Sequence, residues 1–138
     1  MQSSKFIQWL ILLCITCFIG TANAISNEQE AFFDKLSQLC GKQYVGASIF
    51  PAATDDAFFG KVLTAKISSC SDTEIRIPFQ VGDDTSRTWV ITKTEQGLQL
   101  KHDHRHADGT PDSHTNYGGI ANQTGSSYMQ YFAAAAET

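Results

Sequence analysis

Short runs of β-forming residues, separated by turn residues, constrain this chain more than any other feature of its sequence. The run EIRIPFQV is a clear example, because Ile75, Ile77 and Phe79 alternate with other residues and so share one face of a strand. Helix-length segments are missing between the runs, which favours an antiparallel barrel or sandwich over a parallel sheet. The predicted strands are Tyr44–Phe50, Lys61–Ser69, Glu74–Val81, Thr88–Thr94, Leu98–His106, Ser113–Tyr117 and Ser127–Phe132.

One helix is predicted before the strands, over residues 26–42 (SNEQEAFFDKLSQLCGK). Ser26 with Gln29, or Asn27 with Glu30, can form a capping box at its start, and Gly41 is suited to end it. Its apolar side chains recur at helical spacing and form one stripe: Phe32, Phe33, Leu36, Leu39 and Cys40. We therefore expect a mainly β protein with one short N-terminal helix packed on the sheet or plugging it.

Residues 1–24 have the three parts of a signal peptide. Lys5 gives a positive start, Leu10–Ile19 is a short apolar run, and Ala22-Asn23-Ala24 is a small-residue cleavage pattern. A membrane anchor needs about 20 apolar residues, so the run is too short for one. We expect cleavage after Ala24, a single β domain over residues 25–138, and a secreted or periplasmic protein that does not insert into a membrane.

Two cysteines, Cys40 and Cys70, lie in the predicted β domain, and export would bring them into an oxidising compartment. We predict that they form a structural disulfide, since that domain has no C-x-x-C redox spacing. The whole chain has a formal net charge of −4, and removal of Lys5 with the signal peptide makes it more negative. We expect no binding to nucleic acid or to an anionic membrane, because both select basic patches.

All four histidines lie in one stretch, LQLKHDHRHADGTPDSHTNYGG. Alternate side chains of a strand share a face, so His102, His104 and His106 continue the apolar face of Leu98 and Leu100. The charged residues between the histidines take the other face. If the strand stays regular through His106, the three histidines line the cavity of the sheet or its mouth.

Imidazole groups two residues apart on a strand suit a transition metal such as zinc, and His114 is a candidate further ligand from the returning chain. The length of the turn between His106 and His114 decides which face of the sheet His114 takes. A two-residue turn at Asp108-Gly109 puts His114 on the opposite face, whereas a loop of odd length lets it face His106. The sequence leaves both open. In the alternative interpretation the histidines are polar groups that hydrogen-bond the backbone or nearby side chains, namely Asp112, Ser113 or Thr115.

Arg87 and Trp89 share a face of another predicted strand and could form a ligand platform. The leading hypothesis is an exported protein that binds a small molecule or a metal, without catalysis, at these two residues and the three strand histidines. A second hypothesis is a metal-dependent enzyme at the same site, completed by Asp108, Asp112 or His114. The third is a structural envelope protein in which the histidines belong to a polar hairpin. The sequence assigns no catalytic residue and no ligand.

The run from Ile77 to Gly119 resembles a group of small secreted bacterial proteins. It carries blocks similar to theirs, IPFQVGDDTSRTW, GLQLKHDHRHADG and NYGG, and its LCGKQYVG start and paired cysteines match as well. The resemblance implies secretion and a shared fold, and it implies no activity. By fold analogy alone, the helix followed by a meander of strands also resembles calycin barrels such as lipocalins.

Overall fold

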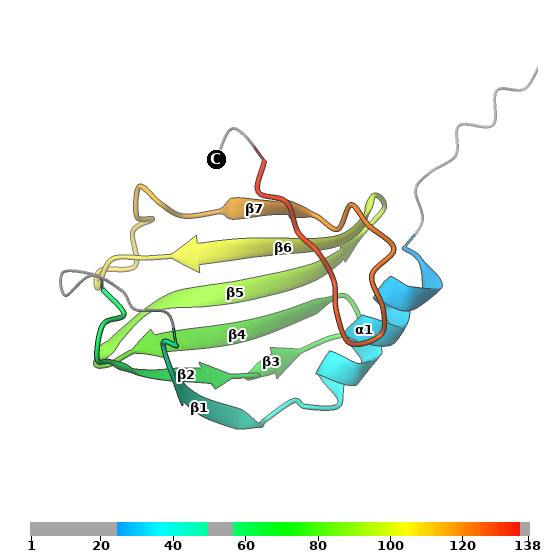
Figure 1. The fold of residues 1–138 in the computed structure, drawn as a ribbon. Helices are drawn as coiled ribbons and strands as arrows, with labels where there is room; N and C mark the ends of the chain where they lie inside the picture. The colour runs from blue at the N-terminus through cyan, green and yellow to red at the C-terminus, as the bar shows by residue number, and fades with distance from the viewer. Residues whose placement is uncertain (1–24, 50–56, 136–138) are drawn as a thin grey trace, which may run out of the picture.

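The computed structural model describes residues 25–49 and 57–135, so the predicted signal peptide lies outside the described residues. One helix precedes the strands of a single antiparallel sheet (Figure 1). The elements are α1 (Asn27–Ser37), β1 (Gln43–Ala47), β2 (Val62–Lys66), β3 (Ser69–Cys70), β4 (Glu74–Val81), β5 (Asp84–Thr94), β6 (Gly97–His104) and β7 (Tyr117–Ile120). The prediction of a mainly β domain with a short N-terminal helix is confirmed.

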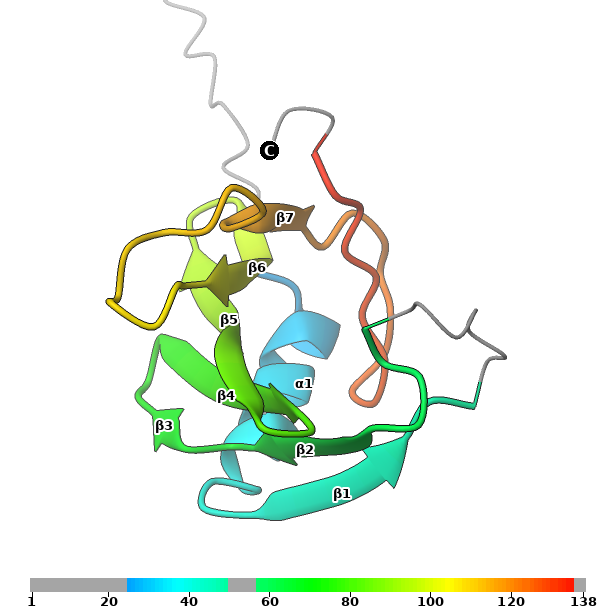
Figure 2. The same cartoon turned by 90° about the vertical axis from the view of Figure 1, so that its left-hand side faces the viewer.

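The sheet has seven strands in the order β1-β2-β4-β5-β6-β7, and β3 pairs with β4 beside that path. Within the described residues β1 and β7 are edges that do not pair with each other, so the sheet is not closed into a barrel. The predicted barrel is therefore found only as an open sheet, and the described strands form one sheet rather than the two of a sandwich. Figure 2 shows the sheet curved around α1, with the C-terminal segment on the side where the edges would meet.

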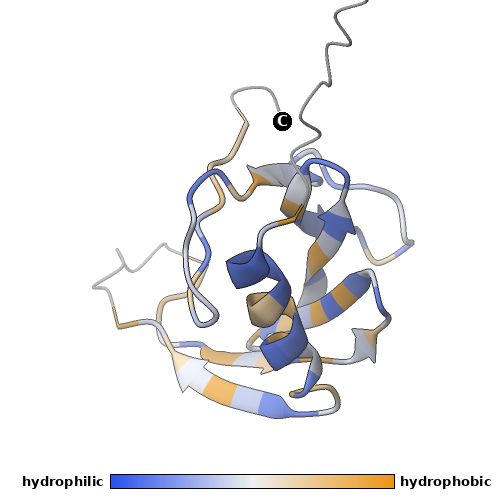
Figure 3. Cartoon of the chain, turned by 90° about the vertical axis from the view of Figure 1, so that its right-hand side faces the viewer, coloured by the Kyte–Doolittle hydropathy of each residue, from blue (hydrophilic) through white to orange (hydrophobic). Residues whose placement is uncertain are grey.

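Helix α1 packs into the curve of the sheet and forms the core there. Ser26 and Gln29 make the predicted capping box, and the buried amide of Gln29 also donates to the carbonyl of Ala121 and accepts from the backbone N–H of Leu98. Phe33 has 1% of its surface exposed. Hydrophilic residues dominate the side of α1 turned away from the sheet (Figure 3). The core cluster consists of Phe33, Ile67, Ile75, Ile91, Leu98 and Ala121.

The helix covers only one end of the concave face. Lys93, near the end of β5, pairs with Glu30 and lies 4.4 Å above the ring of Phe33. Position 93 faces Leu98 across the β5–β6 pair, whereas Arg87, at the other end of the pairing, faces His104. The concave face at Arg87 and His104 is thus the end of the sheet that α1 leaves uncovered.

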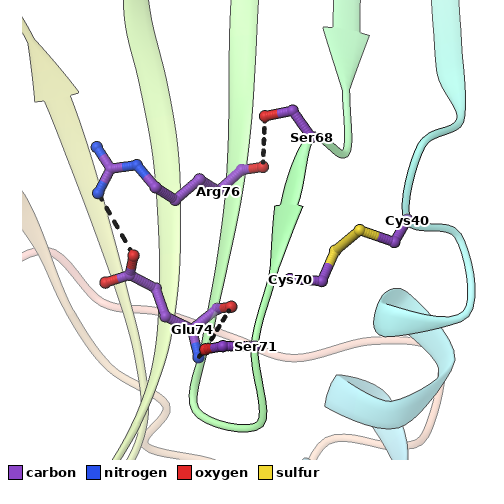
Figure 4. Close-up of a disulfide and its surroundings, with 6 residues drawn as sticks. All are labelled: Cys40, Ser68, Cys70, Ser71, Glu74 and Arg76. Atoms are coloured by element: carbon purple, nitrogen blue, oxygen red, sulfur yellow. Dashed lines mark hydrogen bonds and ion pairs between the residues drawn. A yellow bond between two sulfur atoms is a disulfide. The ribbon is translucent and has the colours of Figure 1, made fainter.

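The disulfide between Cys40 and Cys70 confirms the predicted pairing. It joins the turn after α1 to β3, with the two Cα atoms 6.3 Å apart (Figure 4). Beside it, Ser68 donates a hydrogen bond to the carbonyl of Arg76 on the neighbouring strand. The link fixes the position of the helix relative to the sheet.

Several strand predictions differ from the structure. The segment Lys61–Ser69 divides into β2 and β3, and buried Ile67 between them hydrogen-bonds through its backbone to Gly41 and Lys42. The return strand begins at Tyr117, where the prediction Ser113–Tyr117 ends. The predicted strand Ser127–Phe132 is absent from the described sheet, and that segment makes only isolated bridges. In residues 25–49 and 57–135, no helix is long and apolar enough to cross a membrane.

Candidate functional site

A pocket of about 320 Å³ lies at the uncovered end of the concave face. Strands β4, β5, β6 and β7 supply its floor, and two loops supply its rim. Most of the lining is aromatic or imidazole, with one guanidinium and one carboxylate. The lining residues are Phe58, Phe79, Arg87, Trp89, His102, His104, Asp112, His114 and Tyr117.

The floor is built from two rows of side chains that run across the sheet. In one row Trp89 faces His102, and His102 faces Tyr117 on the next strand. In the other row Phe79 faces Arg87, and Arg87 faces His104. Directly opposed residues of antiparallel strands point to the same face, so both rows project onto the concave side.

His102 is the most buried polar side chain of this floor, with 4% of its surface exposed. Its ring lies between two aromatic rings, 4.8 Å from Trp89 and 4.6 Å from Tyr117 between centroids. Its Nδ1 atom is buried and has no hydrogen-bond partner among the residues that the structure describes. Burial lowers the pKa of His102, the nearby charges of His104 and Arg87 lower it further, and a hydrogen bond with the backbone of His114 opposes them. The ring is therefore held neutral near pH 7.

Arg87 brings a positive charge to the pocket, and Asp84 neutralises it. The guanidinium pairs with the carboxylate of Asp84 three residues earlier, and its Cζ lies 6.0 Å from the centroid of the Phe58 ring. Hydrogen bonds from Ser86 and Arg87 hold the pKa of Asp84 well below its usual range. The pair leaves this side of the pocket with little net charge.

The carboxylate of Asp112 lies close to three histidines at the rim of the pocket. It lies 3.6 Å from Nδ1 of His104, 3.8 Å from Nδ1 of His106 and 3.4 Å from Nδ1 of His114. The backbone N–H of His114 donates to it, and this bond, more than the histidine charges, lowers the pKa of Asp112. The hydroxyl of Ser113 lies 3.0 Å from Nδ1 of His114.

The structure brings most of the predicted site residues together. Arg87, Trp89, His102 and His104 line the pocket, and His114 joins them from the loop rather than from a paired strand. His106 lies elsewhere. Strand β6 ends at His104 and the backbone then turns, so the side chain of His106 is 56% exposed and lines a second hollow on the outer side of the hairpin.

The loop after β6 explains why His114 reaches the pocket from a loop and why His106 lies outside it. Arg105 still pairs, with Ser86 and in a bridge with Pro111, and the turn begins at His106, whose carbonyl accepts from the N–H of Gly109. Asp108 accepts hydrogen bonds from the N–H and hydroxyl of Thr110 in an exposed turn, away from the pocket lining. Asn116 adopts a positive φ of 59° where the chain enters β7. This backbone matches neither of the two predicted hairpins.

The charged residues of β6 lie on the outer face, as alternation predicts. Asp103 accepts from Arg76 of β4 at 2.9 Å and from Arg105 at 2.9 Å. This network ties β6 to a strand two places away and keeps these charges out of the pocket.

Three aromatic residues of the pocket were not among the predicted site residues. The alternation of EIRIPFQV already places Phe79 on the face of Ile75 and Ile77, so a local signal existed for it. Tyr117 enters through the return of the chain and Phe58 through the connection between β1 and β2. No local pattern marks these two residues.

Within the described residues, no group of three or more His, Cys, Asp or Glu side chains is placed to hold a metal ion. The zinc site at His102, His104, His106 and His114 stays a prediction without support from the geometry. The hydrogen bonds and close contacts around Asp112 agree instead with the predicted alternative of a polar loop for His106 and His114.

The resemblance to small secreted bacterial proteins also stays a prediction. No family model, no curated protein and no solved structure matches the chain.

Proposed function

We propose that this protein is exported and binds a small molecule, without catalysis, in the pocket at the uncovered end of its concave face. The observation that carries the proposal is His102, a buried side chain that lines that pocket and whose Nδ1 has no hydrogen-bond partner among the described residues. A buried polar atom without a partner costs about 1–3 kcal/mol. A ligand group that bonds to this atom would remove that cost, so a binding function would explain why a histidine occupies this position.

The composition of the pocket supports the same function. Small-molecule sites are concave and mostly apolar, with a few placed polar groups, and have volumes of about 300–1,000 Å³. This pocket is at the lower end of that range, at about 320 Å³. Three of its polar groups, Arg87, His102 and His104, stand on paired strands, whereas Asp112 and His114 belong to a loop. Strands hold such groups in fixed positions, so a ligand need not order them on binding.

The metal-dependent enzyme remains the second hypothesis, and one measurement separates it from the first. Zinc added to the exported protein is expected to leave its melting temperature unchanged. A stoichiometric zinc site that is lost in His104→Ala would favour the enzyme, because the pocket would then hold a Lewis acid.

The binding function is tested with N-phenyl-1-naphthylamine, an uncharged dye that becomes fluorescent in apolar sites. We expect the exported protein to bind one dye molecule. His104→Trp fills the pocket and should weaken dye binding about tenfold, a change of about 1.4 kcal/mol. Gln99→Trp adds the same ring to the outer face of the same strand and should leave binding unchanged.

Two outcomes would overturn this proposal. Equal dye affinity in both tryptophan variants would mean that the dye binds outside the pocket. No dye binding by a protein that melts cooperatively would leave the pocket without a demonstrated ligand, and the structural envelope hypothesis would take its place.

Export is the other half of the proposal. The disulfide between Cys40 and Cys70 supports it, since such bonds persist in oxidising compartments. Mass spectrometry of the protein collected outside the cytoplasm should give a chain that begins at Ile25. A chain that begins at Met1 and stays in the cytoplasm would contradict this half.

A further inference from the structure

We propose that the pocket selects a planar, uncharged aromatic molecule that carries a hydroxyl or N–H group, and that this group bonds to Nδ1 of His102. The inference rests on the proposed binding function and goes further by naming the class of ligand. It follows from three properties of the pocket, which are its ring walls, the buried and unsatisfied Nδ1 of His102, and its balance of charge.

Rings with different orientations surround the pocket. Trp89 and Tyr117 meet edge to face, at 6.1 Å and 89° between ring planes. Across the floor, the rings of Phe58 and Phe79 lie 6.4 Å apart at 39°. Aromatic pairs prefer offset or edge-to-face contacts at about 4.5–7 Å, so a further flat ring can contact several of these walls at once. A flexible aliphatic chain would make fewer of these contacts and would lose more conformational freedom.

The unsatisfied atom defines the polar group. Nδ1 of His102 belongs to a neutral imidazole, which donates or accepts one hydrogen bond depending on its tautomer. A hydroxyl can serve either tautomer, since it both donates and accepts. An aromatic hydrocarbon would fill the walls but leave Nδ1 without a partner.

The charges favour an uncharged ligand. Asp84 neutralises Arg87 on one side, and on the other side Asp112 already accepts a hydrogen bond from the backbone of His114. A free anion would compete with Asp84 for the guanidinium, and a cation would have to approach Arg87. Among the described residues, the guanidinium at the pocket floor already has a carboxylate beside it.

The experiment compares three probes of similar size by calorimetry. Para-cresol has the ring and the hydroxyl, para-xylene has only the ring, and methylcyclohexanol has only the hydroxyl. The exported protein should bind para-cresol about tenfold more tightly than either of the others. His102→Phe keeps an aromatic wall but removes Nδ1, so it should bind para-cresol and para-xylene equally.

A second readout avoids dependence on the variant. In long-range proton–nitrogen NMR spectra of the wild-type protein, para-cresol should shift Nδ1 of His102, and para-xylene should not. Equal affinity for the three probes, or a preference for para-cresol that survives in His102→Phe, would overturn the inference.

The two proposals fail in different ways. If the dye binds in the pocket but para-cresol has no advantage, only the ligand class is wrong. If neither the dye nor any probe binds, the binding function itself is wrong.

Discussion

Trp89 and His102 face each other across β5 and β6, with their ring centroids 4.8 Å apart and their planes inclined at 55°. The pair closes the inner wall of the pocket, and Tyr117 covers the other side of the imidazole. A phenylalanine could make the same ring contacts without a buried nitrogen. The presence of a histidine therefore costs stability, as expected where a site serves function rather than folding.

The first prediction is that His102→Phe raises the free energy of unfolding by about 1 kcal/mol. The substitution keeps a ring between Trp89 and Tyr117 and removes an unsatisfied nitrogen, and the adjoining pocket gives room for the larger ring. Urea denaturation at pH 7.5 measures the change. His104→Phe is the matched control on the same face, and we expect no gain from it, because Nδ1 of His104 already lies 3.6 Å from Asp112. A marked loss of stability in His102→Phe would mean that the nitrogen has a partner.

The second prediction concerns pH. Burial lowers the pKa of His102 below the value of 6.5 expected in the unfolded chain. As the pH falls through 6.5, the unfolded chain binds a proton at this position before the folded protein does, so the wild-type protein loses stability. His102→Phe lacks this titration. The difference in unfolding free energy between the variant and the wild type should therefore widen from pH 7.5 to pH 5, and a constant difference would contradict the lowered pKa.

The third prediction concerns the two glycines of β7. A Cβ at Gly118 would lie 2.0 Å from the carbonyl oxygen of Leu100, and its φ is +141°. A Cβ at Gly119 would lie 1.9 Å from the carbonyl oxygen of Ala133. We expect Gly118→Ala to cost about 3 kcal/mol or more, because both the backbone conformation and the strand pairing must change. It should also weaken para-cresol binding, since Tyr117 is the preceding residue.

Gly46 on β1 is the control for these glycines. Nothing lies within 4 Å of a Cβ added there, so Gly46→Ala should change the unfolding free energy by less than about 0.5 kcal/mol. Urea denaturation of the two variants gives the comparison. Similar losses for Gly46→Ala and Gly118→Ala would show that contact with β6 is not the cause.

The fourth prediction is that removing the disulfide leaves a folded but weaker protein. Cys40 and Cys70 are 30 residues apart in the chain. In the chain-entropy model the link contributes about 3–4 kcal/mol by restricting the unfolded state. The double variant Cys40→Ser/Cys70→Ser and the reduced wild-type protein should both lose this amount in urea denaturation. Equal stability of oxidised and reduced protein would exclude this contribution.

The parts of the site that local rules govern could be predicted from the sequence. Alternation along β6 gives the face shared by Leu98, Leu100, His102 and His104, because the period of a strand is fixed by its backbone. The capping box at Ser26 and Gln29 is local for the same reason. Just beyond β6 the prediction fails at His106, because a turn begins there.

The parts that depend on distant contacts could not be predicted. Closure of a barrel requires its first and last strands to pair, and no local pattern reports whether they do. The segment after β7 has residues suited to a strand, yet it packs Phe132 against the core and makes only isolated bridges. Phe58 and Tyr117 reach the pocket for similarly non-local reasons, through a connection and through the return of the chain.

The fifth prediction tests the charge balance of the pocket. Asp84 pairs with Arg87, and its side chain is 45% exposed, so Asp84→Asn should cost less than about 1 kcal/mol of stability. The same substitution releases the guanidinium toward the pocket. Para-hydroxybenzoate, the carboxylated relative of para-cresol, should then bind about fivefold more tightly than to the wild type, whereas the affinity for para-cresol should stay the same.

Salt distinguishes this electrostatic effect from a change in pocket shape. The gain for para-hydroxybenzoate should shrink as ionic strength rises, because mobile ions screen a partly exposed charge. Asp83→Asn, at the neighbouring turn position, removes the same charge without releasing Arg87 and is expected to give a smaller gain. If Asp84→Asn changes the affinities for both ligands equally, the pairing of Asp84 with Arg87 is not the cause of the proposed preference for uncharged molecules.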